Sequence, residues 1–117
     1  MNIPHLPPIR YAKMVANKEG KIISILCEFD KAPTLGMMME AAAQGSSAFS
    51  DGAISVAFLA SAKNIRLLIP PTKTALLVKL EPLTSLSHIK EYRFEFFEED
   101  SKISEGVIIL YIPQSTP

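Results

Sequence analysis

The sequence predicts an α+β fold in which a long apolar central helix is wrapped by a curved antiparallel sheet of about five to six strands. Strong helix formers with almost no β-branched residues run from Thr34 to Phe49. Segments of strand character precede and follow this run, and short turns join the later ones, which favours antiparallel pairing. A helix that is apolar all round must be surrounded by protein, so a sheet accompanying a single such helix has to curl around it.

Length and composition narrow the class of protein. The 117 residues suit a single domain over 1–117, with a proline-rich extended segment at 1–8 and a frayed tail at 113–117. Twelve Lys and Arg balance twelve Asp and Glu, so the basic surface of a nucleic-acid binder is not expected. The single cysteine argues against a disulfide scaffold or a Cys-rich zinc site, and we expect no metal. The sequence shows neither a signal-peptide pattern nor a membrane-spanning run, so we expect a cytoplasmic protein.

The segment before the helix contains one clear strand. Residues Ile9 to Lys18 are predicted as a short helix or an irregular stretch, and Glu19-Gly20-Lys21 is a turn signal. Ile22 to Phe29 is apolar and rich in β-branched residues, which indicates a strand. Thr34 follows Pro33 and can cap the helix N-terminus.

The segment after the helix is read entirely as strands. We expect a turn at Ser50-Asp51-Gly52. We also expect a bulge near Ser61, within the first strand that follows this turn. The last strand is apolar on both faces near its end, so it should lie inside the sheet. The expected strands are Ala53–Leu59 continued by Lys63–Ile69, Thr74–Glu81 ended by Pro82, His88–Glu98, and Ile103–Ile112 after a loop at 99–102.

Glu40 stands near the middle of the predicted apolar helix. Its neighbours at i−4, i−3, i+3 and i+4 are Gly36, Met37, Ala43 and Gln44, none of which is cationic. Gly36, Glu40 and Gln44 therefore form one narrow stripe. Either Glu40 is a core carboxylate satisfied by a backbone amide or a cation from a strand, or it faces a cavity and acts as a general acid or base.

Residues 33–44 resemble the helix of hotdog-fold proteins, specifically the 3-hydroxyacyl-[acyl carrier protein] dehydratases. That family carries a Glu-Ala-x-Ala-Gln sequence there. Further segments resemble the family in the same order along the chain. The matching segments are Glu40-Ala41-Ala42-Ala43-Gln44, Ile3-Pro4-His5, Gly20-Lys21-Ile22, Phe58 to Leu67, and Pro70-Pro71.

The resemblance implies a homodimer, or a larger homo-oligomer, with an active-site tunnel between protomers. The substrate would be an acyl thioester on coenzyme A or acyl carrier protein, with no separate cofactor. Glu40 would be the catalytic residue, and the helix-start amides of Leu35 and Gly36 would receive the thioester carbonyl. Supporting roles would fall to Gln44 and Asp30, and the adaptable side chains of Met37 and Met39 would shape the acyl tunnel.

One departure from the dehydratases leaves the reaction open. The family places a catalytic histidine in the loop before the helix, whereas this chain reads Glu28-Phe29-Asp30-Lys31-Ala32-Pro33. His5 and His88 are not obvious replacements, and Cys27 is interpreted as a small buried hydrophobe. Three functions follow: an acyl-thioester hydrolase of fatty acid metabolism with Glu40 as general base or nucleophile, a dehydratase-like enzyme with another acid from Asp30 or a partner subunit, or a non-catalytic acyl-thioester-binding module.

Overall fold

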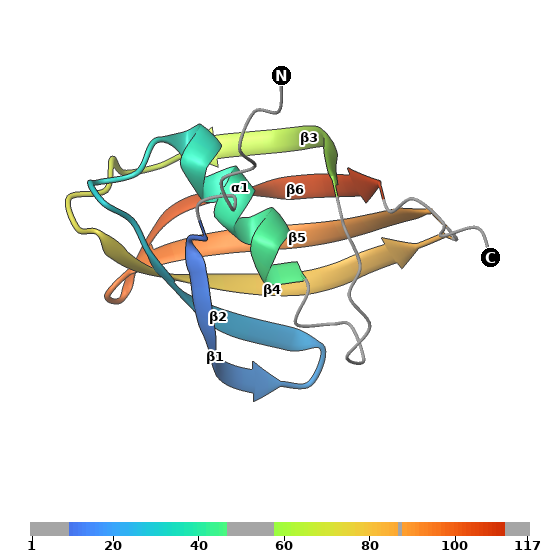
Figure 1. Cartoon of the computed structure of the whole chain (residues 1–117), viewed down its shortest axis with the longest axis horizontal. Helices are drawn as coiled ribbons and strands as arrows, with labels where there is room; N and C mark the ends of the chain where they lie inside the picture. Colours follow the sequence, from blue (N-terminus) through green and yellow to red (C-terminus); the bar gives the residue numbers. More distant parts are fainter. Residues whose placement is uncertain (1–9, 47–57, 87, 112–117) are drawn as a thin grey trace, which may run out of the picture.

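The computed structural model describes residues 10–46, 58–86 and 88–111 and confirms the α+β architecture (Figure 1). Within these residues an antiparallel six-stranded sheet has the order β1-β2-β4-β5-β6-β3. The elements are β1 (Ala12–Glu19), β2 (Ile22–Glu28), α1 (Leu35–Gly45), β3 (Phe58–Leu67), β4 (Ala75–Ser85), β5 (Ile89–Glu98) and β6 (Ser101–Tyr111).

The helix α1 lies inside the curve of the sheet and contacts strands from both of its ends (Figure 1). It buries Met38, Ala41 and Ala42 completely against the sheet. The short alanine side chains allow close approach, and at Gly45 an added Cβ would stand 2.8 Å from Ile25 Cδ1. The core therefore forms between one face of the helix and the inner face of the sheet.

The helix is shorter than predicted. Thr34 caps it as expected, because its Oγ1 accepts the Met37 N–H at 3.2 Å. The regular helix ends at Gly45 after 11 residues, and the Ser46 hydroxyl donates to the Ala43 carbonyl at 2.6 Å. The expected turn at 50–52 and strand residues 53–57 lie outside the described residues, as do the segments 1–8 and 113–117.

The prediction for Ile9 to Lys18 is wrong, because residues 12–19 form strand β1. This strand pairs antiparallel with β2 through a tight hairpin, in which Gly20 adopts a left-handed φ of 62°. Tertiary pairing with β2 overrides the weak strand propensity of this segment.

Within the described residues, the strand predictions after the helix are confirmed with one exception. A register shift between Leu59 and Ser61 confirms the bulge, and β6 is internal because it pairs with β5 and β3. The exception is Pro82, which does not end its strand. It lies within β4 at a second register shift, between Pro82 and Thr84, where a missing N–H is tolerated. In the described part of the chain, no helix is long and apolar enough to span a membrane.

Candidate functional site

One face of α1 stays open in the chain. Gly36 and Glu40 are exposed on this face, and Gln44 is half-buried one turn further along. Met38 and Ala41, on the other side of the helix, are fully buried. The stripe of Gly36, Glu40 and Gln44 predicted from spacing therefore exists.

The expectation that Glu40 is buried is wrong for this chain. The sheet covers only one side of α1, so a helix that is apolar almost all round still presents one face to the outside, and the carboxylate is on it. The Glu40 side chain also forms no ion pair or hydrogen bond with another described residue. The interpretation of Glu40 as a satisfied core carboxylate is thereby excluded.

The first turn of α1 presents two backbone donors close to this stripe. Thr34 accepts the Met37 N–H through its side chain and the Met38 N–H through its carbonyl. The Leu35 and Gly36 N–H groups have no acceptor among the described residues, as expected for the first turn of a helix. A Cβ on Gly36 would meet only Thr34 Oγ1, at 3.9 Å, so space is open beside these donors.

Gln44 links the helix to the chain entering β1. Its Oε1 accepts the backbone N–H of Tyr11 at 2.7 Å and of Ala12 at 3.2 Å. This explains why an amide stands at the end of an apolar helix. A role for Gln44 toward substrate remains a prediction.

The other residues singled out from the sequence take different places. Asp30 is exposed in the loop before α1. Met37 and Met39 are half-buried on either side of Glu40 and pack against the core. Cys27 is fully buried, and burial raises the pKa of its thiol to about 12, which supports its interpretation as a small hydrophobe. Residues 10–46, 58–86 and 88–111 contain no group of three or more His, Cys, Asp or Glu side chains able to hold a metal ion.

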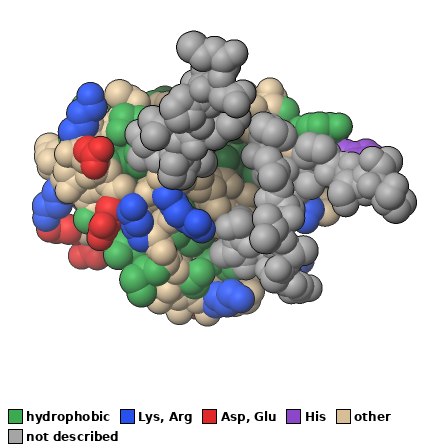
Figure 2. Space-filling view, viewed as in Figure 1, with side chains coloured by type: hydrophobic (Ala, Val, Ile, Leu, Met, Phe, Trp, Pro, Cys, Tyr) green, Lys and Arg blue, Asp and Glu red, His purple; other side chains and the backbone are tan. Residues whose placement is uncertain are grey.

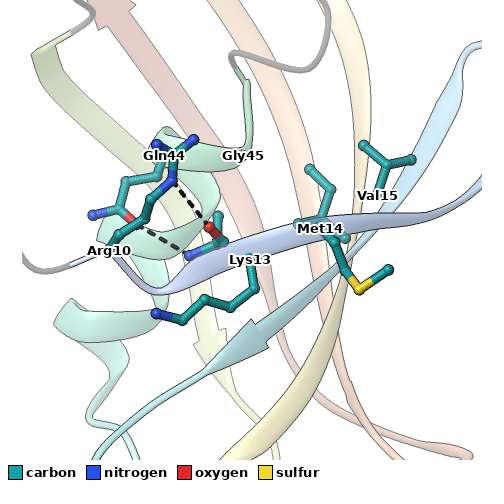
Figure 3. Close-up of a pocket in the computed structure, with 8 residues that line it drawn as sticks. Arg10, Lys13, Met14, Val15, Gln44 and Gly45 are labelled. Carbon is teal, nitrogen blue, oxygen red and sulfur yellow. Dashed lines mark hydrogen bonds between the residues drawn. The ribbon is translucent and has the colours of Figure 1, made fainter.

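Sequence reasoning missed a pocket of about 280 Å³ beside the helix end (Figure 3). It opens between the start of β1 and the last turn of α1, and it was missed because residues 12–19 were not recognised as a strand. The turn signal at Glu19-Gly20-Lys21 already pointed to a hairpin, and hence to a strand on both sides. The labelled lining residues are Arg10, Lys13, Met14, Val15, Gln44 and Gly45.

Comparison with known proteins identifies the fold. No protein-family model matches the sequence, and no curated protein matches it either. The structure resembles the dehydratase heterocomplex ApeI:P from Xenorhabdus doucetiae, with a TM-score of 0.74 and 14% identity over 96% of this chain and 88% of that one. It also resembles an acetyl-CoA-bound protein of Streptococcus mutans (TM-score 0.66, 14% identity, 97% and 99% of the two chains). A third similar structure is a hypothetical thioesterase of Streptococcus pneumoniae with coenzyme A (TM-score 0.62, 10% identity, 88% and 87%).

The chain has the hotdog fold. The resemblance inferred from residues 33–44 is thus confirmed for the fold, with α1 as the hotdog helix. The loop before this helix carries Asp30 and no histidine, and it is anchored by the Phe29 N–H donating to the Thr74 carbonyl at 2.8 Å. The chain therefore offers the Glu40 carboxylate on α1, the exposed Asp30 carboxylate in the loop before it, and the backbone N–H groups of Leu35 and Gly36.

Proposed function

We propose that this hotdog domain hydrolyses acyl thioesters carried by coenzyme A or acyl carrier protein, with Glu40 as the general base or nucleophile. The observation that carries the proposal is the exposed Glu40 carboxylate on the open face of α1. It lies one helical turn from Gly36, whose N–H has no acceptor among the described residues. The similar structures with bound acetyl-CoA or coenzyme A support an acyl-CoA ligand.

The chemistry needs few protein groups. In the general-base route, Glu40 takes a proton from a water molecule, and the water oxygen bonds to the thioester carbonyl carbon. The N–H groups of Leu35 and Gly36 stabilise the negative charge that develops on the carbonyl oxygen, helped by the positive end of the helix dipole. The carbon–sulfur bond then breaks, and the thiolate takes the proton from Glu40. The products are a carboxylic acid and a free thiol.

The nucleophilic route uses the same residue. The Glu40 carboxylate attacks the carbonyl carbon, the thiolate leaves with a proton from water, and the resulting mixed anhydride is hydrolysed by the hydroxide that remains. Both routes benefit from exclusion of bulk water, which the single chain does not provide at Glu40.

A second copy of the chain is proposed to cover the site. In the described sheet, β3 is an edge strand that pairs only with β6, so its outer edge can accept another strand. We propose a homodimer formed there, with the active-site tunnel between the protomers. The free thiol of Cys27 is compatible with a reducing, cytoplasmic compartment.

A second candidate is a dehydratase that works only with a different partner chain. The structural similarity to a dehydratase heterocomplex favours it, together with the absence of a histidine from residues 28–33. Dehydration needs two groups: Glu40 would take the α-proton, and an acid on the partner would protonate the leaving hydroxyl, which departs as water. Asp30 is the only carboxyl group in the loop before α1.

Thiol release from a panel of acyl-CoA thioesters tests hydrolysis. We expect release by the wild-type chain and a loss of roughly 100-fold or more in Glu40→Gln, the usual cost of removing a general base. The matched control is Glu19→Gln, an exposed glutamate at the end of β1. The buried Cys27 thiol should add no background to this assay.

The alternatives give different outcomes in the same experiments. If no acyl-CoA releases thiol above background, hydrolysis is rejected. Loss of absorbance from a trans-2-enoyl thioester, seen only after a partner chain is added, would support the dehydratase. Saturable thioester binding that survives Glu40→Gln without turnover would identify a binding module.

A further inference from the structure

The pocket beside the C-terminal end of α1 carries positively charged side chains next to apolar ones. Met14, Val15 and the buried Ile25 supply apolar walls, while Arg10 and Lys13 are the charged residues lining it. Among the described residues that line it, none is acidic, although the chain as a whole has no net charge. Its volume of about 280 Å³ lies near the lower end of the range for small-molecule pockets, which is roughly 300–1,000 Å³.

Local structure places both cations at this pocket. Along β1, Ala12 pairs with Cys27 and Met14 pairs with Leu26, so Lys13 is the extra residue of a β-bulge. Bulges redirect side chains and are frequent beside functional sites. Arg10 lies two residues before this strand, and its Nε donates to the Ala12 carbonyl at 3.3 Å.

Neither cation is neutralised within the described chain. Lys13 and Arg10 form no ion pair with a described residue, in contrast to five other basic side chains that pair with glutamates. Those five are Lys63, Arg66, Lys73, Arg93 and Lys102. Figure 2 shows Lys and Arg side chains near the middle of this face, with Asp and Glu side chains to their left and hydrophobic side chains below them. The pocket therefore combines an apolar wall with two cations that pair with no anion in the described part of the chain.

The pocket adjoins the proposed site. Gln44 lines it, and Gln44 lies one helical turn beyond Glu40 on the same stripe, a spacing of about 5–6 Å between Cβ atoms. From these observations we infer that the pocket receives the far end of the acyl group, and that this end carries an anion bound by Arg10 and Lys13. The inference rests on the proposed function and names its substrate class: thioesters of dicarboxylic acids with a short apolar spacer.

The phosphate groups of the carrier do not fit this pocket as well. In coenzyme A and in carrier protein, the arm between the thioester sulfur and the nearest phosphate contains two amide groups and is much longer than one helical turn. When the thioester lies at Glu40, an anion bound one helical turn away is therefore part of the acyl group and not a phosphate of the carrier.

Two non-hydrolysable thioethers of coenzyme A test the inference, one S-alkylated with a five-carbon chain ending in carboxylate and one with a five-carbon chain ending in methyl. Their dissociation constants are measured by calorimetry with the full chain. We expect the carboxylate ligand to bind about tenfold more tightly, which corresponds to two partly exposed charge contacts. In the Arg10→Gln/Lys13→Gln double variant the preference should fall below about twofold, while the methyl-ended ligand keeps its affinity.

Two further variants separate charge from structure. Lys13→Arg keeps the positive charge and should retain most of the preference. Lys18→Gln removes an exposed lysine from the same strand outside the pocket and should change neither affinity. Equal binding of both ligands to the wild-type chain would overturn the inference and leave the proposed function standing. Failure of both ligands to bind would contradict the proposed function and the inference with it.

Discussion

The side-chain Oε1 of Gln44 accepts the backbone N–H of Tyr11 at 2.7 Å, across 33 residues of sequence. It also accepts the Ala12 N–H at 3.2 Å, so one amide on α1 fixes the start of the edge strand β1. Glu40, one turn away on the same stripe, makes no such contact in the described chain. The two polar residues of the helix thus differ: the Gln44 side chain ties α1 to the start of β1, whereas the Glu40 side chain is exposed.

Replacing these two residues should lower the free energy of unfolding to very different extents. Gln44→Ala leaves two partly buried N–H groups without their acceptor and should lower the free energy of unfolding by about 1–3 kcal/mol. Glu40→Ala removes an exposed side chain and should change it by less than about 0.5 kcal/mol. Urea unfolding followed by circular dichroism measures both. A stability loss in Glu40→Ala as large as that in Gln44→Ala would contradict this difference.

Two glycines of α1 should respond differently to the same substitution. Gly36→Ala adds a methyl group into open space and should raise stability by up to about 1 kcal/mol, because alanine is the better helix former. The same methyl group narrows access to the Leu35 and Gly36 N–H groups, so thiol release should fall. Gly45→Ala brings a Cβ within 2.8 Å of Ile25 Cδ1, so the buried Ile25 side chain must shift, and this variant should lack the stability gain of Gly36→Ala. If Gly36→Ala leaves thiol release unchanged, those N–H groups do not bind the carbonyl oxygen.

The Cys27 thiol should be inert in the folded protein. Burial raises its pKa to about 12, so almost no thiolate exists near neutral pH, and the sulfur is also shielded from reagents. Mixing with a chromogenic disulfide at pH 8 should give no reaction over minutes, followed by a full equivalent once urea unfolds the chain. Rapid reaction of the native protein would show that β2 is not packed as described.

Acid should weaken the loop between β3 and β4. Backbone N–H bonds from Thr72 and Lys73 to Glu98 hold the pKa of that carboxyl below its ordinary value of 4.5. A carboxyl with a lowered folded-state pKa stabilises the fold above the unfolded pKa, and this contribution disappears as pH falls through the folded value. Thermal stability should therefore drop below about pH 4.5, and less steeply in Glu98→Gln. Glu19→Gln, whose carboxylate bonds no described residue, serves as the control and should follow the wild-type curve.

The sequence allowed prediction of elements that carry strong local signals. Thr34 before a run of good helix formers located the start of α1, and alternating aromatics such as Phe94 and Phe96 located β5. Strand β1 was missed because Ala12 to Glu19 has few strand-forming residues and depends on pairing with β2. A single sequence does not show a bulge, which tolerates proline, so it predicts that Pro82 ends its strand.

The sequence predicts part of the candidate site, because that part depends only on the spacing of residues along the helix. Helical spacing alone places Gly36, Glu40 and Gln44 on one stripe, so that part required no tertiary information. Whether the stripe faces inward depends on how far the sheet curls around α1, which local sequence does not encode. The cationic pocket depends on a bulge at Lys13 and on a strand that was not foreseen, so it emerged only from the structure.

We propose that an acyl thioester lies across the open face of α1 with its carbonyl at the helix start. Amide chemical shifts of ¹⁵N-labelled protein, titrated with a non-hydrolysable thioether of coenzyme A, test this placement. We expect saturable shifts at Leu35, Gly36 and Glu40 that exceed those at residues of the β4–β5 turn. Shifts confined to other parts of the sheet, with α1 unaffected at saturation, would contradict it.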